Sequence, residues 1–109
     1  MANTFKNSVL SNINNSSQEY LADGVTATVI GMTVANVDTT NVTVDVYVLD
    51  QSTSTTAHIV KQAIIPVGGN LVVIGGDQKV VLEPSDRIYI QTSSSGEYVD
   101  AIISVMEIS

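Results

Sequence analysis

Hydrophobic and polar residues alternate with a period of two along much of the chain. The clearest example is Val42–Val48, where valines occupy every second position and mostly polar residues stand between them. This spacing is typical of a β-strand with one buried and one wetter face. Residues 25–36 are strongly apolar but alternate less regularly. We expect two faces in this run, one with Ile30, Met32 and Val34, the other with Ala27, Val29, Gly31 and Ala35.

Short apolar segments bounded by turn-forming residues predict further strands. Gly, Asn, Asp and Ser gather between the segments, and these residues favour tight turns. The expected strands are Ala57–Ile65, Asn70–Ile74, Lys79–Glu83, Arg87–Thr92 and Glu97–Ile108, with a weaker pair near Asn7–Ile13 and Gln18–Ala22. We therefore predict a single all-β domain over residues 1–109. Its fold is expected to be an antiparallel β-sandwich, jelly-roll-like, with about eight strands and no helix longer than two turns.

The last strand is apolar on both faces, which favours association with other subunits. One face carries Val99, Ala101, Ile103 and Val105, and the other carries Tyr98, Ile102, Met106 and Ile108. A two-layer sandwich buries only one face of each sheet, so an apolar outer face suggests a covering neighbour. We expect a homo-oligomer, with a trimer as the first hypothesis. The predicted subunit interface consists of Phe5, Tyr98, Ile102, Met106 and Ile108.

The first residues are expected to form a short N-terminal arm, spanning about residues 1–6. Ala2–Phe5 have few local partners, so this arm would reach a neighbouring subunit with Phe5 as its apolar anchor. If Ile102 and Met106 face a neighbour, changing both to Asp should give a folded monomer. If they lie in the core, the variant should unfold.

Charge and composition exclude several classes of partner. Four Lys and Arg residues stand against eleven Asp and Glu residues, and the net charge is −7. The cations are scattered along the chain, so binding to nucleic acid or to an anionic membrane is not expected. The chain has no cysteine, so it has neither disulfides nor thiolate ligands. Only 14% of residues are charged, which is typical of a chain that lies among protein neighbours.

Candidate chemistry is sparse, and we expect no catalytic residue, no metal site and no cofactor. His58 is the single histidine, and without a second His or a Cys we interpret it as a strand-end residue. The pairs Gly68–Gly69 and Gly75–Gly76 flank a short apolar strand and are interpreted as turns rather than a phosphate loop. His58→Ala should leave assembly with other subunits intact.

Six aspartates could gather around calcium after folding: Asp38, Asp45, Asp50, Asp77, Asp86 and Asp100. None has the spacing of a calcium-binding loop, so we interpret most of them as turn formers or solvated residues. The five aromatic residues include no tryptophan, which counts against a carbohydrate-binding module.

Several segments resemble a family of small virion proteins encoded by tailed phages, especially phages of marine bacteria. They are Met1–Asn7, Val42–Val46, His58–Lys61, the long segment Ile65–Glu83, Asp86 with Arg87, and Ser104–Ile108. The most specific of these is Ile65–Glu83, with the sequence IPVGGNLVVIGGDQKVVLE. The loop near Asn14–Asp23 departs from the family.

The resemblance implies a structural protein located in the virion and assembled in the host cytoplasm. Within the virion we favour a capsid decoration (cement) protein that binds the major capsid protein and stabilises the head shell. The first alternative is a neck or tail component, such as a connector, collar or fibre-attachment subunit. A host-surface glycan-binding module is a more distant alternative, and an enzyme is the least expected.

Overall fold

In the computed structural model, which describes residues 3–108, the chain forms nine strands and no helix over that range. The strands are β1 (Asn3–Ile13), β2 (Gln18–Leu21), β3 (Thr26–Asn36), β4 (Val42–Asp50), β5 (Thr55–Ile65), β6 (Asn70–Ile74), β7 (Val80–Leu82), β8 (Arg87–Thr92) and β9 (Val99–Ile108). The all-β prediction is therefore confirmed. Within the described range, no helix is long and apolar enough to cross a membrane.

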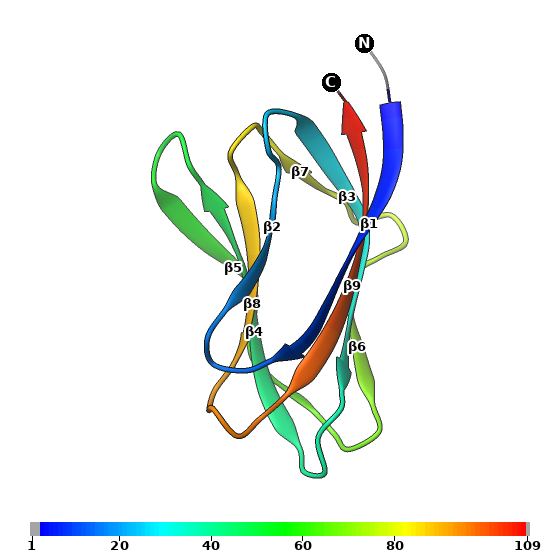
Figure 1. The fold of residues 1–109 in the computed structure, drawn as a ribbon, viewed down its shortest axis with the longest axis vertical. Coiled ribbons are helices and arrows are strands. Elements are labelled where there is room, and N and C mark those ends of the chain that lie inside the picture. Colours follow the sequence, from blue (N-terminus) through cyan, green and yellow to red (C-terminus); the bar gives the residue numbers. More distant parts are fainter. Residues whose placement is uncertain (1–2, 109) are drawn as a thin grey trace.

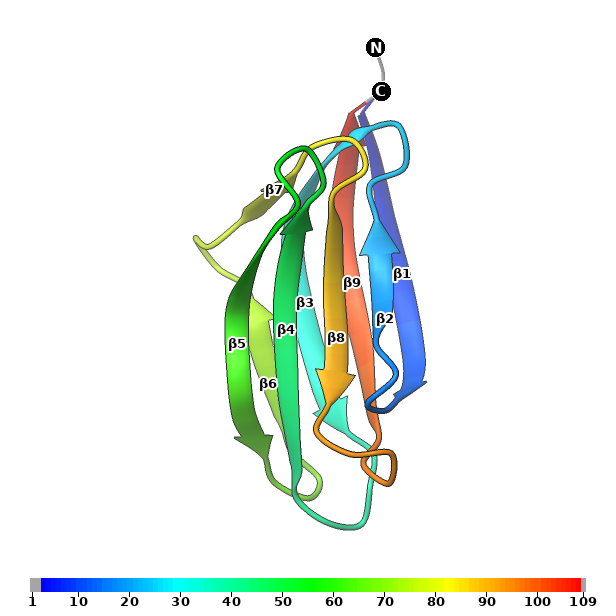
Figure 2. The same ribbon diagram turned by 90° about the vertical axis from the view of Figure 1, so that its left-hand side faces the viewer.

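Two antiparallel sheets face each other and form a jelly-roll sandwich (Figure 1). One sheet has the order β1-β9-β3-β6, with β7 also paired to β3, and the other has the order β2-β8-β4-β5. Figure 2 views the molecule from the side of the second sheet. Without the short β7, the remaining eight strands are the number typical of a jelly roll. They form four antiparallel pairs: β1–β9, β2–β8, β3–β6 and β4–β5.

The core lies between the two sheets and is built from the inward-facing positions of each strand. In β4 the three alternating valines Val42, Val44 and Val46 are fully buried, as their spacing predicts. In β9 the buried set is Val99, Ala101, Ile103 and Val105, which is one of the two apolar faces identified from the sequence. The largest fully buried side chains are Ile13, Met32, Ile65, Ile74, Leu82, Ile88, Ile90 and Ile103.

A β-bulge in β3 overturns the predicted faces of residues 25–36. The pairing with β9 shifts between Val29 and Gly31, so Ile30 is an extra residue in β3. A bulge of this kind changes which positions face the core. Odd-numbered residues of β3 are buried before Ile30, and even-numbered residues are buried after it. Ala27 and Val29 are therefore buried together with Met32 and Val34. The prediction that Ile30 shares a face with Met32 was wrong.

The first described residues, from Asn3 onward, form a paired strand, so the predicted N-terminal arm was wrong for Asn3–Lys6. β1 begins at Asn3, and its backbone pairs with β9 from Asn3 opposite Ile108 to Leu10 opposite Ala101. The sequence missed this extension because Asn3–Lys6 lacks clear alternation and is held by a strand distant in sequence. The predicted arm residues Met1 and Ala2 lie outside the described residues.

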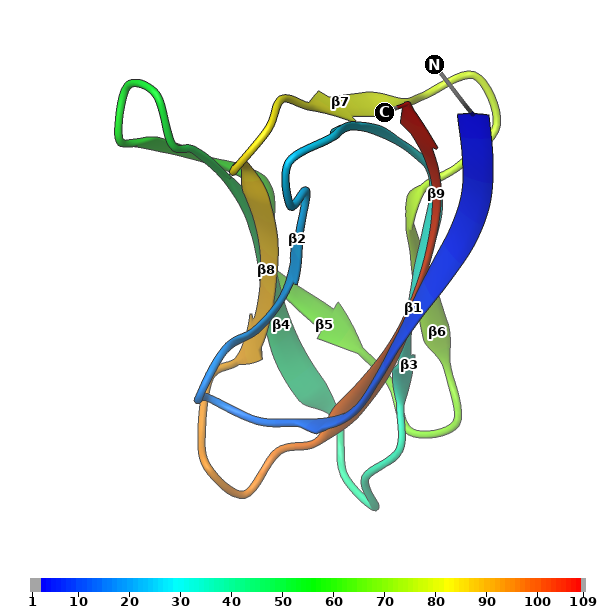
Figure 3. The same ribbon diagram turned by 45° about the horizontal axis from the view of Figure 1, so that its top comes forward.

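Loops join the strands at both ends of the sandwich, and the hairpin between β4 and β5 projects away from it (Figure 3). Residues 51–58 of this hairpin are all exposed. The first and last described strands, β1 and β9, lie side by side (Figures 1 and 2). Asn3 pairs with Ile108, so the first and last described residues lie together.

Candidate interaction surface

The outer face of the β1-β9-β3-β6 sheet exposes several large apolar side chains. Phe5 is 73% exposed, Val9 65% and Ile102 53%. Val72 in β6 and Val81 in β7 are exposed to a similar extent. Single apolar residues on a surface are ordinary, whereas a contiguous group marks an interaction surface.

The strand register arranges these side chains in two rows across the sheet. In one row Phe5 lies opposite Met106, which pairs with Thr28, and Thr28 pairs with Val81. The side chains of directly paired residues lie on the same face of a sheet. The first row therefore runs across β1, β9, β3 and β7.

The second row is parallel to the first. Val9 lies opposite Ile102, which pairs with Thr33, and Thr33 pairs with Val72. This row crosses β1, β9, β3 and β6. We call the two rows together the apolar face; its members are Phe5, Val9, Thr28, Thr33, Val72, Val81, Ile102 and Met106.

A shallow hollow lies between the two rows. Its volume is about 610 Å³, and its lining is Phe5, Lys6, Asn7, Ile30, Ser104 and Val105. The β3 bulge places both Ile30 and Gly31 between the buried residues Val29 and Met32, and Ile30 lines this hollow. The apolar face is thus concave and polar at its centre, where Asn7 pairs with Ser104.

The structure brings together most of the predicted interface residues. Phe5, Ile102, Met106 and Ile108 occupy outer-face positions of β1 and β9, with Met106 and Ile108 half-buried. Tyr98 precedes β9, and its backbone contacts the loop after β3 by donating to Asp38 and accepting from Val37. The sequence missed Val9, Val72 and Val81, because the outward direction of these residues depends on registers set by distant strands.

The outer face of the opposite sheet carries a small aromatic cluster. The rings of Tyr47 and Tyr89 stack with centroids 5.1 Å apart and an angle of 19° between their planes. The ring of His58 lies 5.1 Å from that of Tyr47. The Tyr47 hydroxyl donates to Gln91. His58 therefore packs on the neighbouring strand at the position that pairs with Tyr47.

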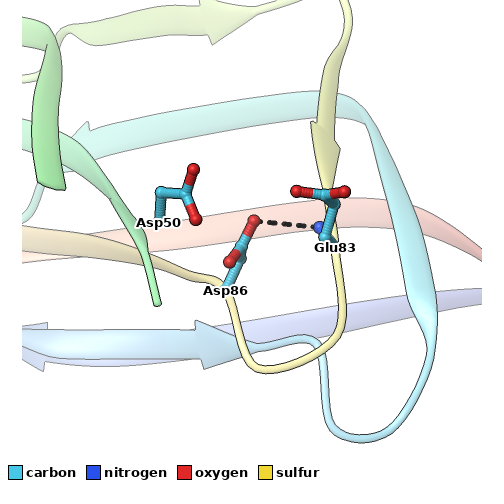
Figure 4. A group of neighbouring side chains, drawn as sticks. All are labelled: Asp50, Glu83 and Asp86. Atoms are coloured by element: carbon cyan, nitrogen blue, oxygen red, sulfur yellow. Dashed lines mark hydrogen bonds between the residues drawn. The ribbon is translucent and has the colours of Figure 1, made fainter. Parts of the chain in front are cut away.

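Three carboxylates meet where the loops after β4 and β7 come together: Asp50, Glu83 and Asp86 (Figure 4). Each offers one oxygen, and these oxygens lie within 4.8 Å of one another. Carboxylates suit calcium or magnesium better than zinc, but calcium takes roughly six to eight oxygens. Both Asp86 oxygens already accept backbone N–H groups, from Gln51 at 3.0 Å and from Glu83 at 3.0 Å. We interpret Asp86 as a structural tie between two loops.

Four of the other five candidate aspartates, Asp38, Asp45, Asp50 and Asp100, accept backbone N–H groups. Asp45 accepts from Gln62 at a bulge in β5, and Asp100 accepts from Asn12 at a bulge in β1. Both bulge residues have positive φ, 55° at Gln62 and 52° at Asn12. Asp50 accepts from the hydroxyl and backbone of Ser52, and this hydrogen bonding lowers the pKa of Asp50.

Removing the Asp86 carboxylate is expected to destabilise the fold. Asp86 is 6% exposed, so Asp86→Ala removes the acceptor of two partly buried backbone hydrogen bonds, from Gln51 and Glu83. The loss of hydrogen bonds to a charged group costs about 1–3 kcal/mol, and urea unfolding should show a loss of that order. Asp77→Ala, at an exposed turn, is the matched control and should change stability by less than about 0.5 kcal/mol. Equal stabilities for the two variants would contradict the structural role.

A polar contact links the two sheets at the open side of the sandwich. The Tyr20 hydroxyl in β2 donates to the Glu107 carboxylate in β9. Glu107 also pairs with Lys6 of β1 at 3.4 Å. Burial, together with the hydrogen bond and charge of Glu107, raises the pKa of Tyr20. The ammonium group of Lys6 is thus directed toward Glu107 on its own subunit.

Comparisons with known proteins give a fold but no family. No protein-family model matches the chain, and no curated protein sequence matches it. Among solved structures, the NLP core of Drosophila, described with pentamer formation and histone binding, has a TM-score of 0.55 at 14% identity. That match covers 99% of this chain and 98% of the Drosophila chain.

Two viral proteins are also similar in structure. An archaeal-virus protein, described with a triple jelly-roll fold and turret assembly, has a TM-score of 0.54 at 11% identity. A chain from the infectious bursal disease virus particle has a TM-score of 0.53 at 11% identity. The matches cover 97% and 94% of this chain but only 28% and 31% of the viral chains. The chain thus spans about a third of the length of each viral chain. The likeness to the triple jelly-roll protein, together with the strand order, confirms the predicted jelly-roll fold.

Proposed function

We propose that the chain is a structural, non-catalytic subunit of a tailed-phage virion and binds the head shell as a decoration protein. The observation that carries this proposal is the apolar face on the outside of the β1-β9-β3-β6 sheet. The face lies opposite the core side of the same sheet, so folding of one chain leaves it uncovered. A neighbouring protein is the natural cover for such a surface.

Covering the apolar face would supply a substantial part of the binding energy. Phe5, Val9 and Ile102 are each more than half exposed, and full burial of such a side chain is worth about 1.5–3 kcal/mol. The concave centre between the rows offers room for a protruding side chain of the partner. We propose that this partner is the major capsid protein.

The fold supports a role in assembly. Structurally similar jelly rolls occur in an archaeal virus described with turret assembly and in an icosahedral virus particle. The low charge of the chain, 14% of its residues, also suits a subunit with extensive protein contacts. Histone binding is described for the Drosophila protein. At 14% identity, the similarity to that protein concerns the fold and does not extend to its binding partner.

A location at the neck or tail of the virion is the second candidate, since the apolar face would bind a connector or tail protein equally well. The glycan-binding alternative has less support. Sugars commonly stack on free aromatic faces, whereas the ring of Tyr47 lies between those of Tyr89 and His58 in the strand order of its sheet.

Rebinding to particles that lack the protein tests the proposal. Purified protein is added to virions from a phage with this gene deleted, and bound protein is measured after sedimentation. We expect saturable binding over the head surface, visible by electron microscopy, and a higher temperature for DNA release. Binding confined to one end of the particle would favour the neck or tail. Binding to host cells but not to particles would overturn the structural role.

A further inference from the structure

β1 is an edge strand whose outer side has no neighbouring strand within residues 3–108. It spans eleven residues, and its pairing with β9 is regular from Asn3 to Leu10. The stretch Asn3–Asn7 is exposed at every position. A strand edge of this kind presents a row of free N–H and C=O groups that can pair with another strand.

The other edges of the two sheets are short or irregular. β2 has four residues, β6 five and β7 three. β5 is as long as β1, but two register shifts interrupt its pairing with β4, and its residue Gln62 has a φ of 55°. Short strands and bulges are the usual ways in which proteins prevent edge-to-edge pairing. β1 has a bulge of its own near Asn12, but its pairing from Asn3 to Leu10 is uninterrupted. Among the described edges, this segment is the longest one with uninterrupted pairing.

We propose that β1 pairs antiparallel with β1 of a second copy across a two-fold axis at Asn7. In this arrangement Asn7 faces Asn7 of the second copy. Phe5 faces Val9 of the second copy, and by symmetry Val9 faces Phe5. The inference goes beyond the proposed function, because it concerns association in solution and holds whether or not the chain belongs to a virion.

The register follows from the side chains of β1. A pair between an aromatic and a β-branched residue on neighbouring strands is stabilising, and the axis at Asn7 makes two such pairs. Moving the axis to Lys6 would place the two lysines directly opposite each other, which is unfavourable. Moving it to Ser8 would instead set Val9 against Asn7 and Phe5 against Ser11.

The same register suits the inner side of the strand. There Lys6 faces Ser8 of the second copy, so no like charges meet. Its ammonium group is already paired with Glu107 of its own subunit at 3.4 Å. An edge lysine ordinarily discourages strand pairing, but here its charge is partly compensated and turned toward the sandwich.

Pairing at this edge would also extend the apolar face from one subunit to the next. Phe5 lies opposite Met106, and Val9 lies opposite Ile102, within each subunit. Across the two-fold axis, the row that contains Met106 and Phe5 would therefore continue into Val9 and Ile102 of the second copy. Two sheets would become one continuous sheet with two unbroken apolar rows.

A single introduced cysteine tests both the dimer and its register, because the chain has no cysteine of its own. Directly opposed residues on antiparallel strands have Cα atoms about 4.5–5.5 Å apart, within the range of a disulfide. Asn7→Cys is therefore expected to form a disulfide-linked dimer rapidly under mild oxidation. Light scattering of the unmodified protein should give twice the 11.5 kDa chain mass.

The matched control is Asn3→Cys, at an exposed position of the same strand. In the proposed register the two substituted positions lie roughly 26 Å apart, because each strand residue advances about 3.3 Å, so this variant should not cross-link. A monomer or a trimer of the unmodified protein would overturn the proposal. So would a dimer in which Asn7→Cys cross-links no faster than Asn3→Cys, since that result requires another interface.

Discussion

Replacing Ile102 and Met106 together with aspartate is expected to abolish loading onto particles while leaving the jelly roll folded. Both positions lie on the outer face of β9, opposite Val9 and Phe5. Each substitution places a charge in the centre of a surface that would be dry when covered. Losing two buried apolar side chains weakens binding by at least about 100-fold. Rebinding to virions that lack the protein measures the loss of binding, and circular dichroism shows whether the variant is folded.

The control for this variant is an equally charged pair on the other outer face. His58→Asp with Ile64→Asp changes two exposed positions of β5, and Ile64 is 70% exposed. This control should load normally. If both double variants load like the unmodified protein, the apolar face is not the docking surface. An unfolded Ile102 and Met106 variant would contradict the outward orientation of these side chains.

Truncation of Ile103 is expected to cost far more stability than truncation of its neighbour Ile102. Ile103 is fully buried between the sheets, whereas Ile102 is 53% exposed on the opposite face of β9. Ile103→Ala therefore removes core packing and leaves a cavity, at a cost of about 2–5 kcal/mol. Ile102→Ala should change the free energy of unfolding by about 0.5 kcal/mol or less. Urea unfolding gives the comparison directly when the free energies of unfolding of both variants fall with the same slope against urea concentration.

This pair of variants tests the register of the central strand. A shift of one residue in β9 would exchange the two faces along its whole length. Similar losses for Ile102→Ala and Ile103→Ala would mean that both side chains are buried, and a larger loss for Ile102→Ala would reverse the assignment. Either result would remove the apolar face from the surface and with it the basis of the proposed docking.

The strands were predictable where local pattern and tertiary environment agree. The valines of β4 follow the period of two with polar residues between them, so their burial could be derived from spacing alone. In β9 the same period separates two apolar faces, and the structure buries the one with Val99, Ala101, Ile103 and Val105. Two features of the fold could not be predicted from the sequence. The bulge at Ile30 lies in a run that is apolar on both sides, so alternation there carries no information about direction. The start of β1 at Asn3 depends on pairing with β9, which is almost the whole chain away.

The candidate surface was predictable only in part, for a similar reason. Ile102 and Met106 were found because the last strand has two apolar faces and a sandwich buries one. Val72 and Val81 lie in short strands of five and three residues, where alternation is too brief to fix a face. The meeting of Asp50, Glu83 and Asp86 depends on how two distant loops are brought together, which spacing along the chain does not specify.

The ratio of this protein to the major capsid protein in purified particles tests the central claim most directly. A decoration protein occupies repeated positions on a symmetric shell, so we predict a fixed whole-number stoichiometry with the major capsid protein. Quantitative mass spectrometry of gradient-purified virions provides the ratio. A small fixed number of copies per particle would place the protein at the neck or tail instead of the shell. Absence from purified virions would contradict a structural role in the particle.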